Sequence, residues 1–387
     1  MSRYPKNIRR LLTLAIAVLC SAVGGDAESP VQTAGSSEQA DGGEWEFRGT
    51  AGVYAKYNSN LTLVDEQSTD RDQKDAFIGE PSADLRLSRV GGPDWWLDLG
   101  FSGRADLHSE HVEENWFFNR GYLSLGRALG EDSINFSSEI RYFTVPDRDQ
   151  FDFLRHTGLL TYKKVFSPLW QLRIGYDNII TRYPESRRFN YSMNGLFVEI
   201  RNTWNLDFST YYVYDFQAYQ GSADPLENNP NHSPSEGDRH TGKIGFDWLI
   251  SGTQTLSGTY LFQRDVSEVG GQQIGDFEGL EDSQDFESEF DFGKHKITLL
   301  YSRRLSRRLM LSSYAEWIRK KFDSEDDPPF PRGTRIDKLF LSSTHLKIRW
   351  SEDLTLRIRY LFRLNQSSLG SQDYRDHILF FGPEYRF

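Results

Sequence analysis

The sequence predicts an all-β fold, a transmembrane up-and-down antiparallel β-barrel of about 16 strands, within a range of roughly 14–18. Three observations support this prediction. Apolar and polar residues alternate with a period of two through most of the chain after residue 44. The connections between the alternating runs are short and long in turn. Tryptophans gather beside the short connections.

The clearest alternation lies in residues 95–107. Apolar or small residues occupy every odd position from Trp95 to Leu107, and mostly polar residues, such as Asp98 and Arg104, occupy the even positions. Successive side chains of a β-strand point to opposite faces. This run therefore predicts a strand with one apolar face and one polar face.

Sixteen runs of this kind follow one another along the chain, with weaker alternation in the second, sixth and eighth. In the eighth run, the residues Leu196, Val198 and Ile200 compete with Phe197 for the apolar parity. The predicted strands cover about 45–60, 77–90, 95–107, 117–126, 133–143, 155–165, 170–181, 190–201, 204–216, 239–250, 255–264, 290–302, 309–321, 336–350, 354–364 and 374–387.

Connection lengths indicate the topology. Every second connection is tight, for example Asn202-Thr203 between the eighth and ninth runs. Those between them are mostly longer and polar, notably 61–76, 217–238, 265–289 and 322–335. Short periplasmic turns at one rim and long extracellular loops at the other are typical of up-and-down membrane barrels.

Tryptophan positions give an independent indication. Most tryptophans open a predicted strand just after a tight turn or close one just before it, so they share one rim. Indole rings at a single height are expected at a membrane surface, whereas the core of a β-sandwich would scatter them. The predicted aromatic girdle comprises Trp45, Trp95, Trp96, Trp170, Trp204, Trp248 and Trp350.

Composition excludes several classes of protein. The chain has 387 residues, a net charge of -11 and a mean hydropathy of -0.61. Its longest apolar stretch, 11–23, is shorter than the ~20 residues of a spanning helix. A single cysteine excludes a disulfide framework and a multi-thiolate metal site. The acidic balance provides no basic surface for nucleic acid, so no nucleic-acid partner is expected.

The first 43 residues are predicted to lie outside the barrel. Basic residues, a short apolar run and the small residues Gly25 and Ala27 indicate a signal peptide over 1–27 that is cleaved on export. Residues 28–43 are rich in Ser, Gly, Gln and acid without an apolar period, which predicts a disordered periplasmic leader. The barrel itself is predicted to cover 44–387.

From residue 44 onward the chain resembles the bacterial outer-membrane β-barrel proteins, without matching one characterised family. Phe381, Tyr385 and Phe387 resemble the terminal signature that such barrels present to their assembly machinery. The resemblance implies the outer membrane of a Gram-negative bacterium, with outer-membrane lipid and the barrel-assembly machinery as partners. Pro383 departs from an ideal closing strand because it lacks an N–H, so a bulge near the rim is one expectation.

The polar parity is predicted to line a water-filled interior. Arg357, Arg359 and Arg363 share one face of a strand and form a basic ladder. A basic wall facing an acidic one would select solutes by charge, but any polar lumen also needs charges, so both interpretations stay open. The other predicted pore-lining residues are Lys347, Arg349, Lys320, Asp98, Arg104, Asp106, Glu139, Arg141, Arg173, Asp177 and Asp207.

Two polar segments carry weaker signals. Residues 265–291 hold ten acidic residues and no basic one, and this segment either folds into the pore or stays solvated outside. His108, Glu110 and His111 offer metal-ligating groups, although their spacing fixes no geometry. The sequence contains no catalytic, phosphate-binding or dinucleotide motif, so we expect no enzyme activity, cofactor or resident metal.

The sequence therefore predicts a porin-like channel for small hydrophilic solutes, with a bias toward anions from the arginine ladder. One alternative is a dedicated conduit that exports an acidic surface polysaccharide, or a scaffold barrel around a partner protein. Another is an adhesion role of the long loops. The sequence leaves open whether the barrel is a monomer or a homo-oligomer.

Overall fold

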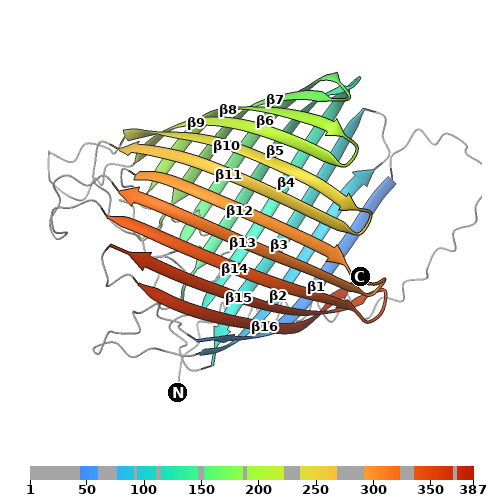
Figure 1. Cartoon of the computed structure of the whole chain (residues 1–387), viewed down its shortest axis with the longest axis vertical. Coiled ribbons are helices and arrows are strands. Elements are labelled where there is room, and N and C mark those ends of the chain that lie inside the picture. The colour runs from blue at the N-terminus through green and yellow to red at the C-terminus, as the bar shows by residue number, and fades with distance from the viewer. Residues whose placement is uncertain are drawn as a thin grey trace, which may run out of the picture.

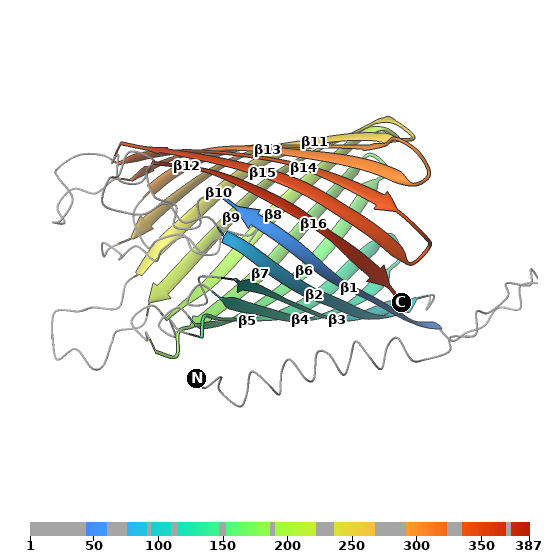
Figure 2. The same cartoon turned by 90° about the horizontal axis from the view of Figure 1, so that it is seen from below.

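A computed structural model of the chain describes residues 44–59, 76–90, 94–109, 115–146, 152–185, 190–221, 236–267, 292–322, 335–368 and 373–387. Neighbouring strands in the sequence pair antiparallel, and the last strand pairs with the first, so the sheet closes into a barrel (Figures 1 and 2). The strands within these residues are β1 (Glu44–Asn58), β2 (Ala76–Val90), β3 (Trp95–His108), β4 (Trp116–Leu129), β5 (Asp132–Thr144), β6 (Phe153–Ser167), β7 (Trp170–Arg182), β8 (Tyr191–Asn205), β9 (Phe208–Gly221), β10 (Glu236–Ser251), β11 (Gln254–Ser267), β12 (Phe292–Arg304), β13 (Leu309–Phe322), β14 (Ile336–Arg349), β15 (Leu354–Ser367) and β16 (Tyr374–Arg386). The predicted fold class is confirmed.

Strand pairing fixes the dimensions of the barrel. One circuit through the pairing registers returns to β1 displaced by 20 residues. With sixteen strands and ordinary strand spacings, this stagger corresponds to a strand tilt of about 40° and a backbone radius of about 16 Å. The tilt is evident in both views (Figures 1 and 2).

Tight turns gather at one end of the barrel, at the right of Figure 1. They join β4 to β5, β6 to β7, β8 to β9, β10 to β11, β12 to β13 and β14 to β15. Gly130, between β4 and β5, has a φ of 70°, a conformation that glycine adopts without strain. The intervening connections lie partly or wholly outside the described residues, as does the predicted segment 1–43.

The turn between β8 and β9 differs from the prediction. β8 continues to Asn205 and β9 begins at Phe208, so the turn is Leu206-Asp207, not Asn202-Thr203. The backbone N–H of Asp207 donates to the side-chain oxygen of Asn205 at 2.8 Å, which stabilises the later turn. Trp204 therefore closes β8 and does not open β9, although it lies near the same rim.

Side-chain parity separates an apolar outer face from a polar inner face. Large apolar side chains such as Phe101, Ile140 and Leu196 are 44%, 51% and 63% exposed on the outside. In β8, Leu196, Val198 and Ile200 face outward. Phe197 faces inward, where a Cβ on Gly175 would lie only 2.3 Å from its ring. The described residues contain no helix with the length and apolar character needed to cross a bilayer.

The closing strand is paired to its last residue. Residues on both sides of Pro383 keep one register with β1, so the expected bulge is absent. Phe387 and Gly49 exchange two backbone hydrogen bonds, with N···O distances of 2.9 and 3.0 Å. Pro383 lacks a backbone N–H and so cannot donate a hydrogen bond to its neighbour strand, but the C-terminal residues stay paired with β1.

Candidate functional site: the charged lumen

Alternation places all but one of the predicted pore-lining residues on the inner face. They share their parity with buried inward residues such as Asp376 and Asp106, and oppose the exposed apolar parity. The exception is Asp207, which lies in the β8–β9 turn at the rim. Its placement on the lumen wall was wrong because the predicted strand began four residues too early.

The arginine ladder on β15 is neutralised in part by β16. Arg357 forms an ion pair with Glu384 at 2.5 Å, and Arg363 forms one with the fully buried Asp376. Between them, Arg359 donates to the hydroxyl of Ser343 at 2.9 Å. All three arginines lie on the inner face of β15, and Arg357 and Arg363 are paired with carboxylates of β16.

A buried ion cluster joins the first three strands. The ammonium of Lys56 lies 2.9 Å from Glu80 and 2.5 Å from Asp106. These three residues are at most 8% exposed, and the Lys56 ammonium also lies 5.0 Å from the centre of the Phe380 ring. The cluster therefore ties β1, β2 and β3 together near the seam where β16 closes the barrel.

The wall opposite β15 is not uniformly acidic. Glu139 accepts from both Arg120 and Arg141, and Arg173 pairs with Glu199. Arg201 continues this chain to Asp247, at 3.2 Å. Arginine and carboxylate alternate here, so the described residues favour paired charges over separate basic and acidic walls.

Several inward basic side chains have no acidic partner within the described ranges, among them Lys243 and Lys347. Lys347 lies directly beside Arg357 in register. The inward positions of the described strands carry more basic than acidic side chains, although the whole chain has a net charge of -11. The inner surface is thus more positive than the protein as a whole.

Aromatic residues also reach the inner face. Trp116, Phe143, Val145, Phe153 and Tyr183 form a buried cluster at the ends of β4 to β7 opposite the tight turns. The guanidinium of Arg155, on the same wall, donates to the Tyr191 hydroxyl at 2.8 Å. This aromatic cluster gives one side of the lumen a rigid apolar lining beside a cation.

Sequence reasoning missed several of the charged groups. They are Lys56, Glu80, Arg120, Glu199, Lys243, Lys296, Glu316, Asp376 and Glu384. Strict parity counting along each strand would have found most of them, because each lies an even number of residues from an inward neighbour. Which charges pair depends on the register between strands, which alternation does not reveal.

Six of the seven predicted girdle tryptophans lie on the outer face, between 36% and 71% exposed. Trp96 is the exception, because it faces inward, and a Cβ on Gly126 would lie 2.0 Å from its indole ring. In the predicted terminal signature, Phe381 and Tyr385 are 51% and 44% exposed on the outside. The ring of Phe387 packs over Gly49.

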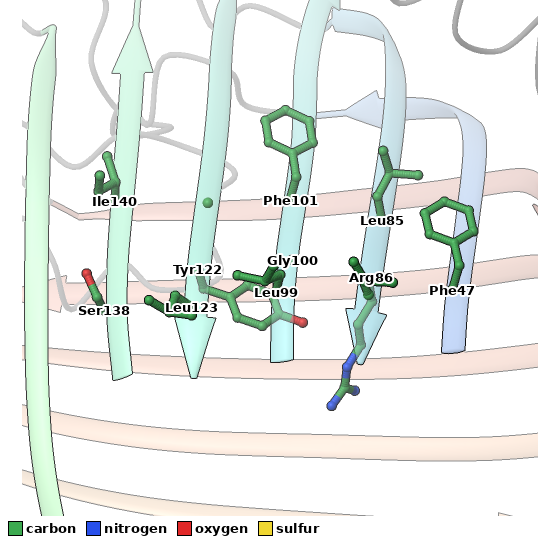
Figure 3. Close-up of a pocket in the computed structure, with 12 residues that line it drawn as sticks. Phe47, Leu85, Arg86, Leu99, Gly100, Phe101, Tyr122, Leu123, Ser138 and Ile140 are labelled. Carbon is green, nitrogen blue, oxygen red and sulfur yellow. The ribbon is translucent and has the colours of Figure 1, made fainter. Parts of the chain in front are cut away.

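A shallow groove of about 560 Å³ lies on β1 to β5, between apolar side chains. Its walls include Phe47, Leu85, Phe101 and Ile140 (Figure 3). A Cβ on the lining residue Gly121 would meet nothing within 4 Å. This groove is apolar and is separate from the charged lumen.

The predicted metal-ligating and acidic segments are largely outside the described residues. Glu110 and His111 are not described, and the described ranges contain no group of three or more His, Cys, Asp or Glu placed to hold a metal ion. Of the segment 265–291, only its first three residues are described. Asp265 is buried and accepts from Arg239 at 2.8 Å.

Solved structures similar to this one include bacterial outer-membrane proteins. OmpF of Salmonella typhi, in complex with daunomycin, has a TM-score of 0.52 and 12% identity over 90% of this chain and 98% of that chain. The outer membrane channel DcaP of Acinetobacter baumannii has a TM-score of 0.51 and 10% identity over 92% and 100%. No protein-family model and no curated protein matches the sequence. The chain has the fold of the bacterial outer-membrane β-barrel proteins.

Proposed function

We propose that this protein is an outer-membrane channel that passes small hydrophilic solutes and favours anions. The observation that carries the proposal is the polar, charge-rich inner face of a closed barrel whose outer face is apolar. A barrel with this parity suits a membrane, because closure pairs the backbone groups that lipid cannot hydrogen-bond. Its polar interior suits water.

The size of the barrel supports a pore. Barrels of 16 to 18 strands are wide enough to leave an aqueous channel after side chains fill part of the interior. With a backbone radius of about 16 Å, inward arginines from opposite walls do not meet across the axis.

The expected anion preference comes from the basic groups that lack counterions. Paired groups such as Arg357–Glu384 present little net charge to a passing ion, whereas Lys243 and Lys347 form no ion pair with any described residue. A solute carrying phosphate or carboxylate would gain from these groups, and a cation would be repelled.

Reversal potentials in a salt gradient across a planar bilayer test this selectivity. We expect an anion preference that falls at least about twofold when Lys243 and Lys347 are both changed to Gln, since two uncompensated charges leave the lumen. The matched control is Arg182→Gln, because Arg182 is exposed on the outer face of β7. A cation preference, or an equal effect of the control, contradicts the proposal.

A second candidate is export of an acidic polysaccharide, favoured by arginines that lie over inward aromatic rings. Arg173 lies 5.4 Å from the centre of the Phe197 ring, and Arg359 lies 5.2 Å from that of Phe380. Such pairs offer an apolar face for a sugar ring and a cation for its carboxylate. Block of the channel current by acidic, but not neutral, oligosaccharides would favour this candidate.

The proposed location is the outer membrane of a Gram-negative bacterium, reached by export and cleavage of residues 1–27. The barrel-assembly machinery and outer-membrane lipid are the proposed partners. Mass spectrometry of protein from an outer-membrane fraction tests the location and the cleavage, because the mature chain is expected to begin at Glu28.

A further inference from the structure

Basic side chains gather at the tight-turn end of β12 to β16, the end at which the C-terminus also lies (Figures 1 and 2). Among the tight turns that the structure describes, only the β12–β13 turn, residues 305–308, contains basic side chains. Further basic residues stand at the adjoining strand ends. We call the group the basic mouth, and its residues are Arg304, Arg308, Lys347, Arg349 and Arg386.

Backbone pairing holds the basic mouth together. Arg304 and Lys347 lie in one row, because both are register partners of Met310 on the strand between them. The backbone N–H of Arg349 donates to the carbonyl oxygen of Arg308 at 2.8 Å. The cations are therefore neighbours on a paired sheet edge and not separate residues of loose loops.

The strand residues of the basic mouth face the lumen. Arg386 has the inward parity of the buried Asp376 on the same strand. Lys347 and Arg349 are two residues apart on β14 and so share one face, and Arg304 points to this face because it lies in the row of Lys347. A solute that crosses this end of the barrel passes these groups.

The basic mouth lacks a counter-charge in the part of the chain that the structure describes. None of its five side chains forms an ion pair with a described residue, and all except Lys347 are exposed. Glu384, an inward acid of the same sector, pairs with Arg357 instead. Glu352 and Asp353, in the β14–β15 turn, are exposed and form no ion pair with the group. This sector of the rim therefore carries an excess of positive charge.

The spacing within the basic mouth suits a solute that carries two anionic groups. Residues two apart on a strand lie about 6.5 Å apart, and direct register partners lie about 5 Å apart. Lys347 has Arg349 at the first spacing and Arg357 at the second. A singly charged anion engages one cation at a time, whereas two anionic groups joined in one small molecule engage two cations at once.

We propose that the basic mouth is a binding site for small solutes with two anionic groups, and that Lys347 binds them together with Arg304 or Arg349. Guanidinium groups suit this role because they contact phosphate or carboxylate oxygens through two N–H groups. The inference rests on the proposed anion channel, for which it names a class of solute. Binding itself needs only the folded barrel.

The test measures binding to the purified, folded barrel in detergent by isothermal titration calorimetry. The probes are fructose 1,6-bisphosphate and fructose 6-phosphate, which share one sugar and differ by one phosphate. We expect wild type to bind the bisphosphate at least about tenfold more tightly. The double variant R304Q/R349Q should reduce this preference at least about fivefold, because each change removes a cation beside Lys347.

The matched control is R127Q/R182Q, which removes two exposed charges from the outer faces of β4 and β7. It should keep the full preference for the bisphosphate. Bilayer recordings add the side of entry. Leu206→Cys marks the compartment that the tight turns face, because Leu206 is 100% exposed in the β8–β9 turn and can be labelled there. The bisphosphate should reduce the current at an at least about threefold lower concentration from this side.

Four results would overturn the inference: equal affinity of wild type for the two sugars, an unchanged preference in R304Q/R349Q, an equal loss in the control, or equal block from both sides. The same data separate the two proposals. A barrel that binds the bisphosphate through the basic mouth but does not conduct contradicts only the channel. An anion-selective barrel without the bisphosphate preference contradicts only the basic mouth.

Discussion

Lys56 illustrates how single residues hold the inner face together. Its side chain is 4% exposed, and its ammonium lies between the carboxylates of Glu80 and Asp106. A buried cation between two carboxylates offsets its own desolvation only because both partners are in place. Removing the lysine would leave two buried carboxylates facing each other without a counter-charge.

We therefore expect Lys56→Met to lower the free energy of unfolding by about 3–5 kcal/mol. Urea titration of the barrel refolded in lipid vesicles measures this loss. Lys243→Met is the control, since Lys243 has no ion pair among the described residues, and it should change stability much less. Equal effects of the two variants would show that the ion cluster on β1 to β3 contributes little.

Glycines under inward aromatic rings give a second residue-scale prediction. A Cβ on Gly175 would lie 2.3 Å from the Phe197 ring and 2.9 Å from the carbonyl oxygen of Leu160. Gly175→Ala should cost about 1–3 kcal/mol of stability through overpacking. Gly242→Ala, where a Cβ would meet nothing within 4 Å, should be close to neutral. A comparison of the two urea midpoints checks the difference.

At the scale of strands, alternation predicted every strand seen in the described residues, and it failed at one turn. In the eighth and ninth strands the odd-even pattern of Trp204, Leu206 and Phe208 runs through the turn without a break. A two-residue turn preserves parity, so hydrophobic period alone cannot locate it. The Asn205 side chain that accepts from Asp207 was the usable signal.

The closing strand gives the element-scale prediction. Phe387 contributes two backbone hydrogen bonds to Gly49 and a ring that covers this glycine. Deleting Phe387 should reduce the folded fraction severalfold by loosening the β1–β16 seam, whereas Phe387→Tyr should be nearly neutral because it keeps the ring and the backbone. Gel mobility with and without heating reports the folded fraction. Undiminished folding of the deletion would contradict a role of the terminus in closure.

At the scale of the whole molecule, the sequence indicated the barrel, its polar interior and the outward belt, but not how the charges combine. Alternation assigns a side chain to a face, and the registers then decide that Arg357 meets Glu384 and that Arg363 meets Asp376. The predicted basic ladder consequently carries less net charge than a count of arginines suggests. In the proposed channel, the charge available to act on solutes is that of residues such as Lys347, which the registers leave without an ion pair among the described residues.

The central claim is that one side-chain parity faces a water-filled interior and the other faces lipid. Ser312 and Ser313 are consecutive on β13, where Ser312 faces inward beside Ser302 and Ser313 shares the outward parity of Trp317. The sequence has a single natural cysteine, Cys20, which falls in the predicted signal peptide and not in the predicted barrel segment 44–387. Either serine can therefore be replaced by cysteine without a second thiol in the barrel.

The most direct measurement is modification of Ser312→Cys and Ser313→Cys by a charged, water-soluble thiol reagent during bilayer recording. The parity assignment predicts that the reagent labels Ser312→Cys and lowers its conductance, while Ser313→Cys stays unlabelled in the bilayer. Labelling of Ser313→Cys alone, or equal labelling of both, would contradict the claim that the polar face lines an aqueous channel.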